Sequence, residues 1–440
     1  MKTLLSLLLV ITLSHVTIGQ TTTIPDSNFE LALINLGLDT GIPNGTVPTV
    51  NIDTLTSLDV SSSSINNLTG IEDFTDLAIL DCSWNQITTL NVTQNTKLID
   101  LNCRQNQLLS SINVTQNQLL ETLECGQTQI TNLDVSQNIN LTKLRVRFLD
   151  LTTLDVSQNL ALTWLDCYNN QLSALNITNN TALDYLNCSW NQIISLDVTQ
   201  NSNLSDLSCN NNLLTNINVS LNPLLESLSI SYNQLTTLNV TNNSLLNFLS
   251  CWNNQLTTIN LPHNPLLYSL GLSNNTLSEL SINQNPLVVS LTCDGNQLTC
   301  LRVKNGNNTN FISFQTFNNP NLYCIDVDDA TWATANWPLI DSTTSFSTNC
   351  NNPCTAGINE NKLSNIIIYP NPTNGSINID LEETGYNINL HLTNAIGQII
   401  LVENYKSTSN IRFDIDSPKG VYFLRLESDG EIITKKIIKE

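Results

Sequence analysis

The cysteines are the side chains of this chain whose types and spacing most directly suggest chemistry. Eight of the twelve recur at steps of 21 residues, once 22, or at multiples of such steps: Cys82, Cys103, Cys125, Cys167, Cys188, Cys209, Cys251 and Cys293. A stacked row of thiolates suits a soft metal such as zinc. Equivalent positions, however, hold Val146, Ile230 and Leu272, and no histidine or carboxylate shares this face. We therefore interpret the row as buried apolar side chains and expect no metal site.

The other four cysteines lie outside this register, towards the C-terminus: Cys300, Cys324, Cys350 and Cys354. Since the N-terminal residues predict export to an oxidising compartment, we expect at least one disulfide among them, closing the end of the repeats. The sequence does not fix the pairing. Asp326, Asp328 and Asp329 cluster nearby and could bind calcium, although a solvated acidic turn is the simpler interpretation.

Aromatic side chains lie close to the repeated cysteine position and are candidates for contact with a ligand. Rigid rings offer a large contact area at a small cost in conformational entropy. The candidates are Trp164, Tyr168, Tyr185, Phe248 and Trp252. A second row of outward residues in each repeat is small and monotonous, and we interpret it as scaffold.

Basic residues are scarce, and several of them cluster. They are Arg104, Lys143, Arg145 and Arg147, in a chain with 16 lysines and arginines. Alternate residues of a strand project from one face, which predicts a local positive patch for a carboxylate or sulfate. The alternative is that these cations pair with Glu124 and Asp166 of adjacent repeats and keep the sheet soluble.

Signatures of catalysis are absent from the sequence. Beyond the N-terminal segment only His263 and His391 remain as histidines, and no nucleophile-elbow, HExxH or phosphate-loop pattern occurs. Acidic pairs occur in any acidic chain and single out no hydrolytic site. A formal net charge of −21 repels phosphate backbones. The sequence therefore predicts a protein that is not an enzyme, needs no cofactor and binds no nucleic acid.

The first residues have the order of a secretory signal peptide. Lys2 precedes an apolar run at residues 4–13, and small residues follow up to Gly19. The run is too short to span a bilayer. We expect residues 1–19 to be removed on export, and no later apolar run is long enough for a transmembrane segment.

A 21-residue repeat organises the chain from about Leu77 to Val303. Its unit reads L-x-x-L-x-C-x-x-N-x-L-x-x-L-x-V-x-x-N-x-x, and both halves alternate apolar and polar residues as half-buried strands do. A single unit cannot bury its own leucines, but stacked units bury them against each other. We predict a mainly β solenoid at residues 61–305, with about eleven coils and two short strands in each coil.

Asparagines recur at two further positions of the unit. One row begins at Asn85 and Asn106 and resumes from Asn170 to Asn296, and the other runs from Asn95 to Asn285. Where a strand turns a corner, an inward amide can both donate to and accept from the backbone. We therefore predict a structural role for both rows.

The repeat resembles the irregular, nested 21-residue class of bacterial leucine-rich repeats, which is related to the repeats of the internalins. The resemblance covers well over half of the chain. By this resemblance, residues 20–60 are an N-terminal cap. From the four C-terminal cysteines we expect residues 306–354 to form a C-terminal cap with one or more disulfides. Asp26 or Ser27 can begin a short helix in the first cap. Phe29, Leu33 and Leu36 of this helix would cover the first coil.

The composition changes after Cys354. Residues 355–364 are polar and predict a linker, and seven short alternating segments follow at residues 365–440, which predict a small β-sandwich. Several motifs of this tail resemble the C-terminal sorting domain of the type IX secretion system of Bacteroidota. The matching residues include Pro370, Asn371, Pro372, Gly375, Gly397, Gly420, Tyr422, Lys435 and Lys436. The resemblance implies recognition by the outer-membrane translocon; the alternative is an ordinary β-sandwich adhesin module.

These observations predict an exported binding or adhesion module, anchored at the cell surface or released, for extracellular protein or glycan ligands. A structural surface protein or spacer without a specific ligand is the alternative. A third interpretation is a non-catalytic part of a polysaccharide-degrading system.

Overall fold

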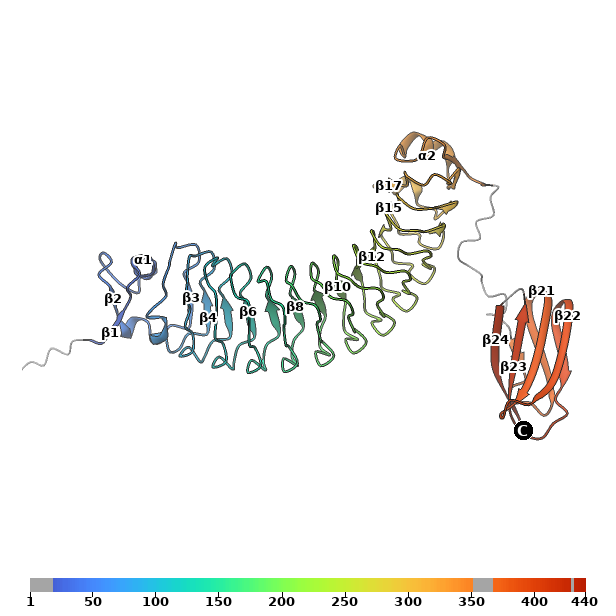
Figure 1. Ribbon diagram of the computed structural model, residues 1–440, viewed down its shortest axis with the longest axis horizontal. Helices are drawn as coiled ribbons and strands as arrows, with labels where there is room; N and C mark the ends of the chain where they lie inside the picture. Colours follow the sequence, from blue (N-terminus) through green and yellow to red (C-terminus); the bar gives the residue numbers. More distant parts are fainter. Residues whose placement is uncertain (1–18, 351–366, 429–430) are drawn as a thin grey trace, which may run out of the picture.

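The computed structural model describes residues 19–350, 367–428 and 431–440. The predicted signal peptide, apart from Gly19, and the predicted linker at 355–364 lie outside these residues, as does Cys354. The described residues form a stack of coils and a C-terminal sheet, each with its own hydrophobic core (Figure 1).

One parallel sheet runs along the whole stack. Each strand has three residues, of which the central one is buried, and neighbouring strands pair in register to give thirteen strands in the sheet. They are β3 (Ser57–Asp59), β4 (Ile79–Asp81), β5 (Asp100–Asn102), β6 (Thr122–Glu124), β7 (Lys143–Arg145), β8 (Trp164–Asp166), β9 (Tyr185–Asn187), β10 (Asp206–Ser208), β11 (Ser227–Ser229), β12 (Phe248–Ser250), β13 (Ser269–Gly271), β15 (Ser290–Thr292) and β17 (Ser313–Gln315). The predicted solenoid is confirmed. It has more turns than the predicted eleven because the sheet continues past both ends of the recognisable repeat.

The second half of each coil differs from the prediction of a second strand. A second parallel sheet joins only the last coils in the described residues, through β14 (Glu279–Ser281), β16 (Cys300–Arg302), β18 (Cys324–Asp326) and β19 (Ser345–Ser347). In earlier coils, side-chain amides bind the carbonyls of this row instead. Asn117 Nδ2, for example, donates to the carbonyls of Val92 and Asn95 at 2.9 and 2.8 Å. Two strands per coil are therefore present mainly near the C-terminal end of the stack.

The two asparagine rows stabilise the coils in different ways. In the first row, Asn191 Oδ1 accepts from Leu172 N at 3.0 Å, and its Nδ2 donates to the carbonyls of Cys167 and Cys188 at 3.1 and 3.0 Å. This confirms the predicted role. In the second row, the Nδ2 atoms donate to two carbonyls, but the buried Oδ1 atoms have no partner among the described residues. The structural role predicted for the second row is therefore carried by its donating Nδ2 atoms alone.

A small N-terminal cap covers the first coil. It contains β1 (Thr21–Thr23) paired antiparallel with β2 (Thr46–Pro48), α1 (Ser27–Asn35), and two 3-10 turns, η1 (Thr49–Asn51) and η2 (Ile71–Asp73). Asp26 Oδ1 accepts from the backbone nitrogens of Asn28 and Phe29 at 2.9 and 3.1 Å and so begins α1. Phe29 and Leu33 are fully buried, whereas Leu36 is 51% exposed. Leu36 lies past the last residue of the helix, so it does not cover the coil as predicted.

At the other end, the stack closes with η3 (Asn308–Asn310), α2 (Ala330–Asn336) and β19. A disulfide joins Cys324 to Cys350 with a Cα–Cα distance of 5.9 Å, as expected for this end. Cys300 is also disulfide-bonded. The rings of Phe314 and Trp337 stack with centroids 3.9 Å apart and belong to the hydrophobic core of the stack.

The acidic turn predicted near these cysteines binds its own backbone. Asp329 Oδ1 accepts from the nitrogens of Thr331 and Trp332 at 2.9 and 3.0 Å and so begins α2. Asp328 Oδ1 accepts from Gly306 N at 3.2 Å. In the part of the chain that the structure describes, no group of three potential metal ligands occurs. The calcium alternative therefore has no support from this geometry.

The tail is one curled antiparallel sheet of β20 (Ile367–Tyr369), β21 (Ser376–Asn394), β22 (Ile399–Asp414), β23 (Gly420–Ser428) and β24 (Glu431–Lys439). The sequence predicted seven separate segments in this region. Two of them form the single strand β21, and two others form the single strand β22. Their pairing shifts register between Asp380 and Gly385 and again between Leu392 and Thr393. Such irregularities bend a strand, so the long sheet curls and buries its own inner face instead of forming a two-layered sandwich.

Candidate ligand-binding face

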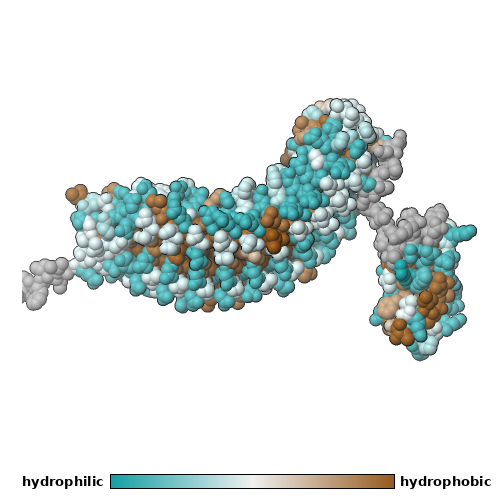
Figure 2. All heavy atoms as spheres, in the orientation of Figure 1, coloured by the Kyte–Doolittle hydropathy of each residue, from teal (hydrophilic) through white to brown (hydrophobic). Residues whose placement is uncertain are grey.

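Every residue predicted to bind a ligand lies on the thirteen-stranded sheet or just after one of its strands. The first and third residues of each strand point outward because the central residue is buried. Lys143 and Arg145 lie on β7, Trp164 on β8, Tyr185 on β9 and Phe248 on β12, while Arg104, Arg147, Tyr168 and Trp252 lie two residues after β5, β7, β8 and β12. The surface of the coils is mostly hydrophilic with separate hydrophobic patches (Figure 2).

The basic residues on and after β7 are paired with carboxylates of adjacent coils. Lys143 Nζ lies 2.9 Å and Arg145 Nη1 lies 3.0 Å from Glu124 Oε1. Burial raises the pKa of Glu124, but the hydrogen bond from Lys143 and the charge of Arg145 outweigh this and lower it. Arg147 binds Asp166, and this hydrogen bond raises the pKa of Arg147.

These pairs confirm the alternative in which the cations pair with Glu124 and Asp166. Asp166 is fully buried, so moving Arg147 towards a ligand would leave a buried carboxylate unpaired. Arg104 differs, because its side chain has no hydrogen bond or ion pair within the described residues. The four predicted cations therefore lie together, but three of them are already bound to carboxylates of this chain.

Trp164 is also in contact with its own chain on both sides. Its ring stacks on Tyr185 of the next strand, with centroids 3.7 Å apart and planes 7° apart. From the preceding strand, Arg145 Cζ lies 5.6 Å from the centroid of the Trp164 ring. Strands β7 and β9 flank β8, so the two faces of the indole are covered. Trp164 and Tyr185 thus form a rigid stack that offers mainly its edges to a ligand.

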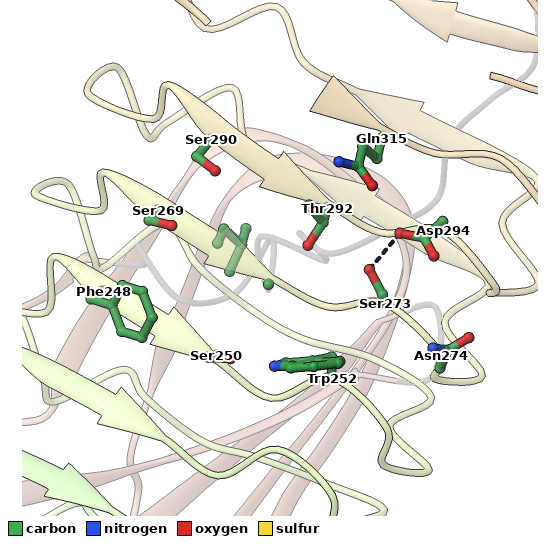
Figure 3. Close-up of a pocket in the computed structure, with 12 residues that line it drawn as sticks. Phe248, Ser250, Trp252, Ser269, Ser273, Asn274, Ser290, Thr292, Asp294 and Gln315 are labelled. Atoms are coloured by element: carbon green, nitrogen blue, oxygen red, sulfur yellow. Dashed lines mark hydrogen bonds between the residues drawn. The ribbon is translucent and has the colours of Figure 1, made fainter. Parts of the chain in front are cut away.

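The outward residues after β12 form a hollow in the sheet. A pocket of about 430 Å³ lies over β12, β13, β15 and β17, with Phe248 and Trp252 among its lining residues. Both rings are partly exposed, at 37% and 39%. Figure 3 shows small polar side chains of the neighbouring strands beside them. Sequence analysis identified the two rings but missed these small residues, because they are single serines and threonines spread over several coils and carry no signal of their own.

A further row of aromatic residues lies in the turns that follow the strands. They have positive φ: Trp84 (57°), Phe148 (56°), Trp190 (58°) and Tyr232 (54°). Each is at least 42% exposed. Asparagine, which tolerates this left-handed conformation, holds the same turn in other coils, as at Asn169 and Asn211. Aromatic residues cost conformational strain in these turns, and Phe148 and Tyr232 offset part of it through edge-on contacts with Tyr168 and Trp252.

The eight repeated cysteines are fully buried and free of disulfides. Burial raises the pKa of Cys125, Cys188 and Cys251 to about 12. Protonated, inaccessible thiols are neither nucleophiles nor metal ligands. The interpretation of this row as apolar core is confirmed by their burial.

In the tail, the residues of the predicted sorting motifs meet at β24. Asn371 Nδ2 donates to the carbonyl of Lys436 at 2.8 Å, and its Oδ1 accepts from Ile438 N at 2.9 Å. Thr373 N donates to the Ile438 carbonyl at 2.8 Å. Lys439 Nζ donates to the carbonyls of Ile415 and Ser417 at 2.6 and 2.8 Å.

Other motif residues shape the turns of the same sheet. Gly397, with φ of 84°, completes a turn in which Asn394 Oδ1 accepts from Gln398 N at 2.9 Å. Tyr422, which follows Gly420, is buried and donates its hydroxyl to the Pro418 carbonyl. Lys435 and Lys436 are exposed on β24. The motifs therefore hold the last strand in place and leave its basic side chains accessible.

Residues 367–440 match the family described as secretion system C-terminal sorting domain. The tail is a sorting domain of this kind. The motif residues that we predicted as a sorting signal fall within the matched segment.

The coils are similar to those of internalins. The functional domain of InlJ from Listeria monocytogenes, which includes a cysteine ladder, aligns with a TM-score of 0.64 and 26% identity, over 96% of this chain and 99% of that one. A second internalin from the same species aligns with a TM-score of 0.62 and 23% identity, over 75% and 97%. Internalin J is 51% identical over 51 residues, which are 12% of this chain and 6% of internalin J. The sequence match thus spans a small part of that protein, and the structures show a leucine-rich-repeat solenoid of the internalin type.

Because Asn371 holds β24, we predict that Asn371→Ala weakens the sorting domain. Loss of two hydrogen bonds at this exposed site is expected to lower its free energy of unfolding by about 1–2 kcal/mol. The fraction of the chain found outside the cell should fall as well. Thermal unfolding and quantitative immunoblots of cell and medium measure the two effects. Ser407→Ala, an exposed change on β22, is the control, and equal export of both variants would contradict the prediction.

Proposed function

We propose that this protein is an exported binding module, which uses the thirteen-stranded sheet and the turns after its strands to bind an extracellular protein or glycan. The sorting domain indicates export through type IX secretion to the cell surface or into the medium. In the described ranges, no helix is long and apolar enough to cross a bilayer. The solenoid resembles internalins and the tail matches a sorting domain, and both of these families are non-catalytic. This supports binding rather than catalysis.

The exposed aromatic residues in strained turns carry this proposal. Phe148 and Trp190 are 42% and 51% exposed, and each occupies a positive φ position that asparagine fills in neighbouring coils. Asparagine there would cost less conformational strain. Phe148 offsets part of its strain by packing edge-on against Tyr168, with centroids 5.2 Å apart, whereas Trp190 has no ring contact within the described residues. The strain at Trp190 therefore favours a bound partner as the reason for its aromatic side chain.

A glycan and protein array tests the proposal, probed with residues 20–440 and with the double variant Phe148→Asn and Trp190→Asn. Because asparagine already occupies these turns elsewhere, the variant should keep its fold, and relief of strain should offset the lost contact between Phe148 and Tyr168. Its binding to any ligand of the parent chain should fall about tenfold, as for the loss of aromatic contacts at an interface.

The matched control is Leu160→Asn with Leu221→Asn, which removes two leucines that are 59% and 53% exposed, in the turns before β8 and β11. Equal binding by both double variants would reject the turns as the binding surface. A parent chain that retains nothing on the array would support a structural or spacer role instead.

A further inference from the structure

We infer that the pocket over β12, β13, β15 and β17 binds a neutral hexose unit of a glycan, a proposal that rests on the proposed function and names its ligand class. With a volume of about 430 Å³, the pocket falls within the usual range for small-molecule sites. Its lining residues come from the strands at the C-terminal end of the thirteen-stranded sheet and from the turns after them. Figure 3 shows its aromatic and polar side chains together.

Phe248 and Trp252 supply flat apolar walls to this pocket. Serine occupies the Phe248 position on the strands on either side, as Ser227 and Ser269, so the ring rises above a surface of short side chains. Tyr232 packs edge-on against Trp252, with centroids 4.9 Å apart, and limits the freedom of the indole. A fixed, exposed ring suits the flat C–H face of a sugar ring, because both surfaces are rigid and little entropy is lost on contact.

The polar part of the pocket offers neutral hydrogen-bonding groups. The side chains of Ser269, Ser290, Thr292 and Gln315 make no hydrogen bond within the described residues, and all four line the pocket. Hydroxyl and amide groups can donate to and accept from sugar hydroxyls. These groups are on three successive strands, so a ring stacked on an aromatic wall can reach several of them at its edge.

The charges of the pocket disfavour an anionic ligand. Asp294 is the one ionisable residue among those described as lining it, and none of them is basic. Ser273 Oγ donates to Asp294 Oδ1 at 2.6 Å, which leaves the second carboxylate oxygen for a ligand hydroxyl. The paired cations on and after β7 lie several strands away. A neutral polyhydroxyl ligand fits this balance better than a sulfated or uronic one.

Gly271 and the small residues beside it, Ser250 and Thr292, form the floor of the hollow. The position of Gly271 carries Arg145, Asp166 and Asn187 in earlier strands, where a side chain covers the sheet. A Cβ at Gly271 would lie 3.5 Å from Ser250 Oγ and 3.7 Å from Thr292 Oγ1, in ordinary contact. A larger side chain is therefore tolerated by the fold and would fill the space that a ligand needs.

Titration calorimetry of residues 20–440 with cellohexaose, maltohexaose, mannohexaose and a galacturonic acid hexamer tests the inference. We expect a neutral hexamer to bind, and the acidic hexamer to bind more weakly. Phe248→Ser, Trp252→Ser and Gly271→Asn should each lower the affinity about tenfold or more. All three residues introduced occur at equivalent positions of other coils, so the fold should be retained, and thermal unfolding checks this.

Leu160→Thr is the control, because Leu160 is 59% exposed in the turn before β8, outside the pocket, and Thr181 holds the equivalent position in the next coil. It should leave the affinity unchanged. The inference would be overturned if no neutral hexamer bound or if the acidic hexamer bound more tightly. It would also be overturned if the three pocket variants bound a neutral hexamer with the same affinity as the parent chain. The proposed function would survive if the array still retained the chain through a protein, and would fail only if nothing on the array did so.

Discussion

Replacing Asn191 by alanine is expected to lower the free energy of unfolding of the solenoid by about 3 kcal/mol. The Leu172 N–H is buried and donates to Asn191 Oδ1, which the variant lacks. The carbonyls of Cys167 and Cys188 lose one of two donors each, since Asn170 and Asn212 also bind them. An unsatisfied buried N–H and a small cavity therefore contribute more than the lost amide bonds to the carbonyls.

Guanidinium chloride unfolding, followed by circular dichroism, measures this effect. Gln192→Ala is the control, because Gln192 is the next residue and is exposed. Its side chain makes no hydrogen bond within the described residues, and its backbone N–H donates to the Leu172 carbonyl at 2.9 Å. That change should cost less than about 0.5 kcal/mol. Since each coil contacts only its neighbours, a separate early transition in Asn191→Ala would also agree with the prediction. Equal unfolding midpoints for the two variants would contradict it.

The sequence was sufficient to predict the solenoid because the repeat has a period that only stacking satisfies. Leu80, Cys82 and their equivalents are inward in every coil, and the structure buries them. The second row was harder to predict, since alternation at Leu90 and Val92 is equally compatible with a strand and with an extended segment bound by asparagine amides. The amide of Asn117 on the carbonyl of Val92 decides between the two, and the pattern alone does not contain that contact.

The candidate site was predictable in part for a related reason. Aromatic residues such as Phe248 and Trp252 stand out in a sequence of asparagine, serine and threonine. The hollow, however, results from small side chains on the neighbouring strands. Gly271 and Thr292 carry no signal until their strands are placed side by side with β12. Pairing between Arg147 and Asp166 was predictable as an alternative, because the two residues lie 19 positions apart and adjacent coils bring them together.

Raising the pH from about 9 towards 12 is expected to unfold the solenoid, and the buried thiols are the cause. An unfolded cysteine titrates near its ordinary pKa of 9.0, whereas burial raises the pKa of Cys125, Cys188 and Cys251 to about 12, and the other five ladder thiols are raised as well. Above pH 9 the unfolded state therefore binds fewer protons than the folded state. The contribution of these thiols is complete below pH 9 and is lost as the pH rises through the folded pKa.

Each thiol in this window lowers the free energy of unfolding by about 1 kcal/mol per pH unit. Eight such thiols together approach the whole stability of a typical domain, about 5–15 kcal/mol, within one or two pH units. A pH titration followed by far-ultraviolet circular dichroism, in freshly mixed samples, should show a cooperative transition near pH 10–11.

A variant with Cys125, Cys167, Cys188 and Cys209 replaced by valine isolates the thiols from the other groups that titrate at alkaline pH. Valine already fills this position at Val146, so the replacement should retain the packing. Tyrosines and lysines are the same in both proteins and cannot account for a difference between them. The alkaline midpoint of the variant should therefore rise, because half of the ladder thiols no longer have to stay protonated. An unchanged midpoint would show that groups other than the buried cysteines limit the alkaline stability of the stack.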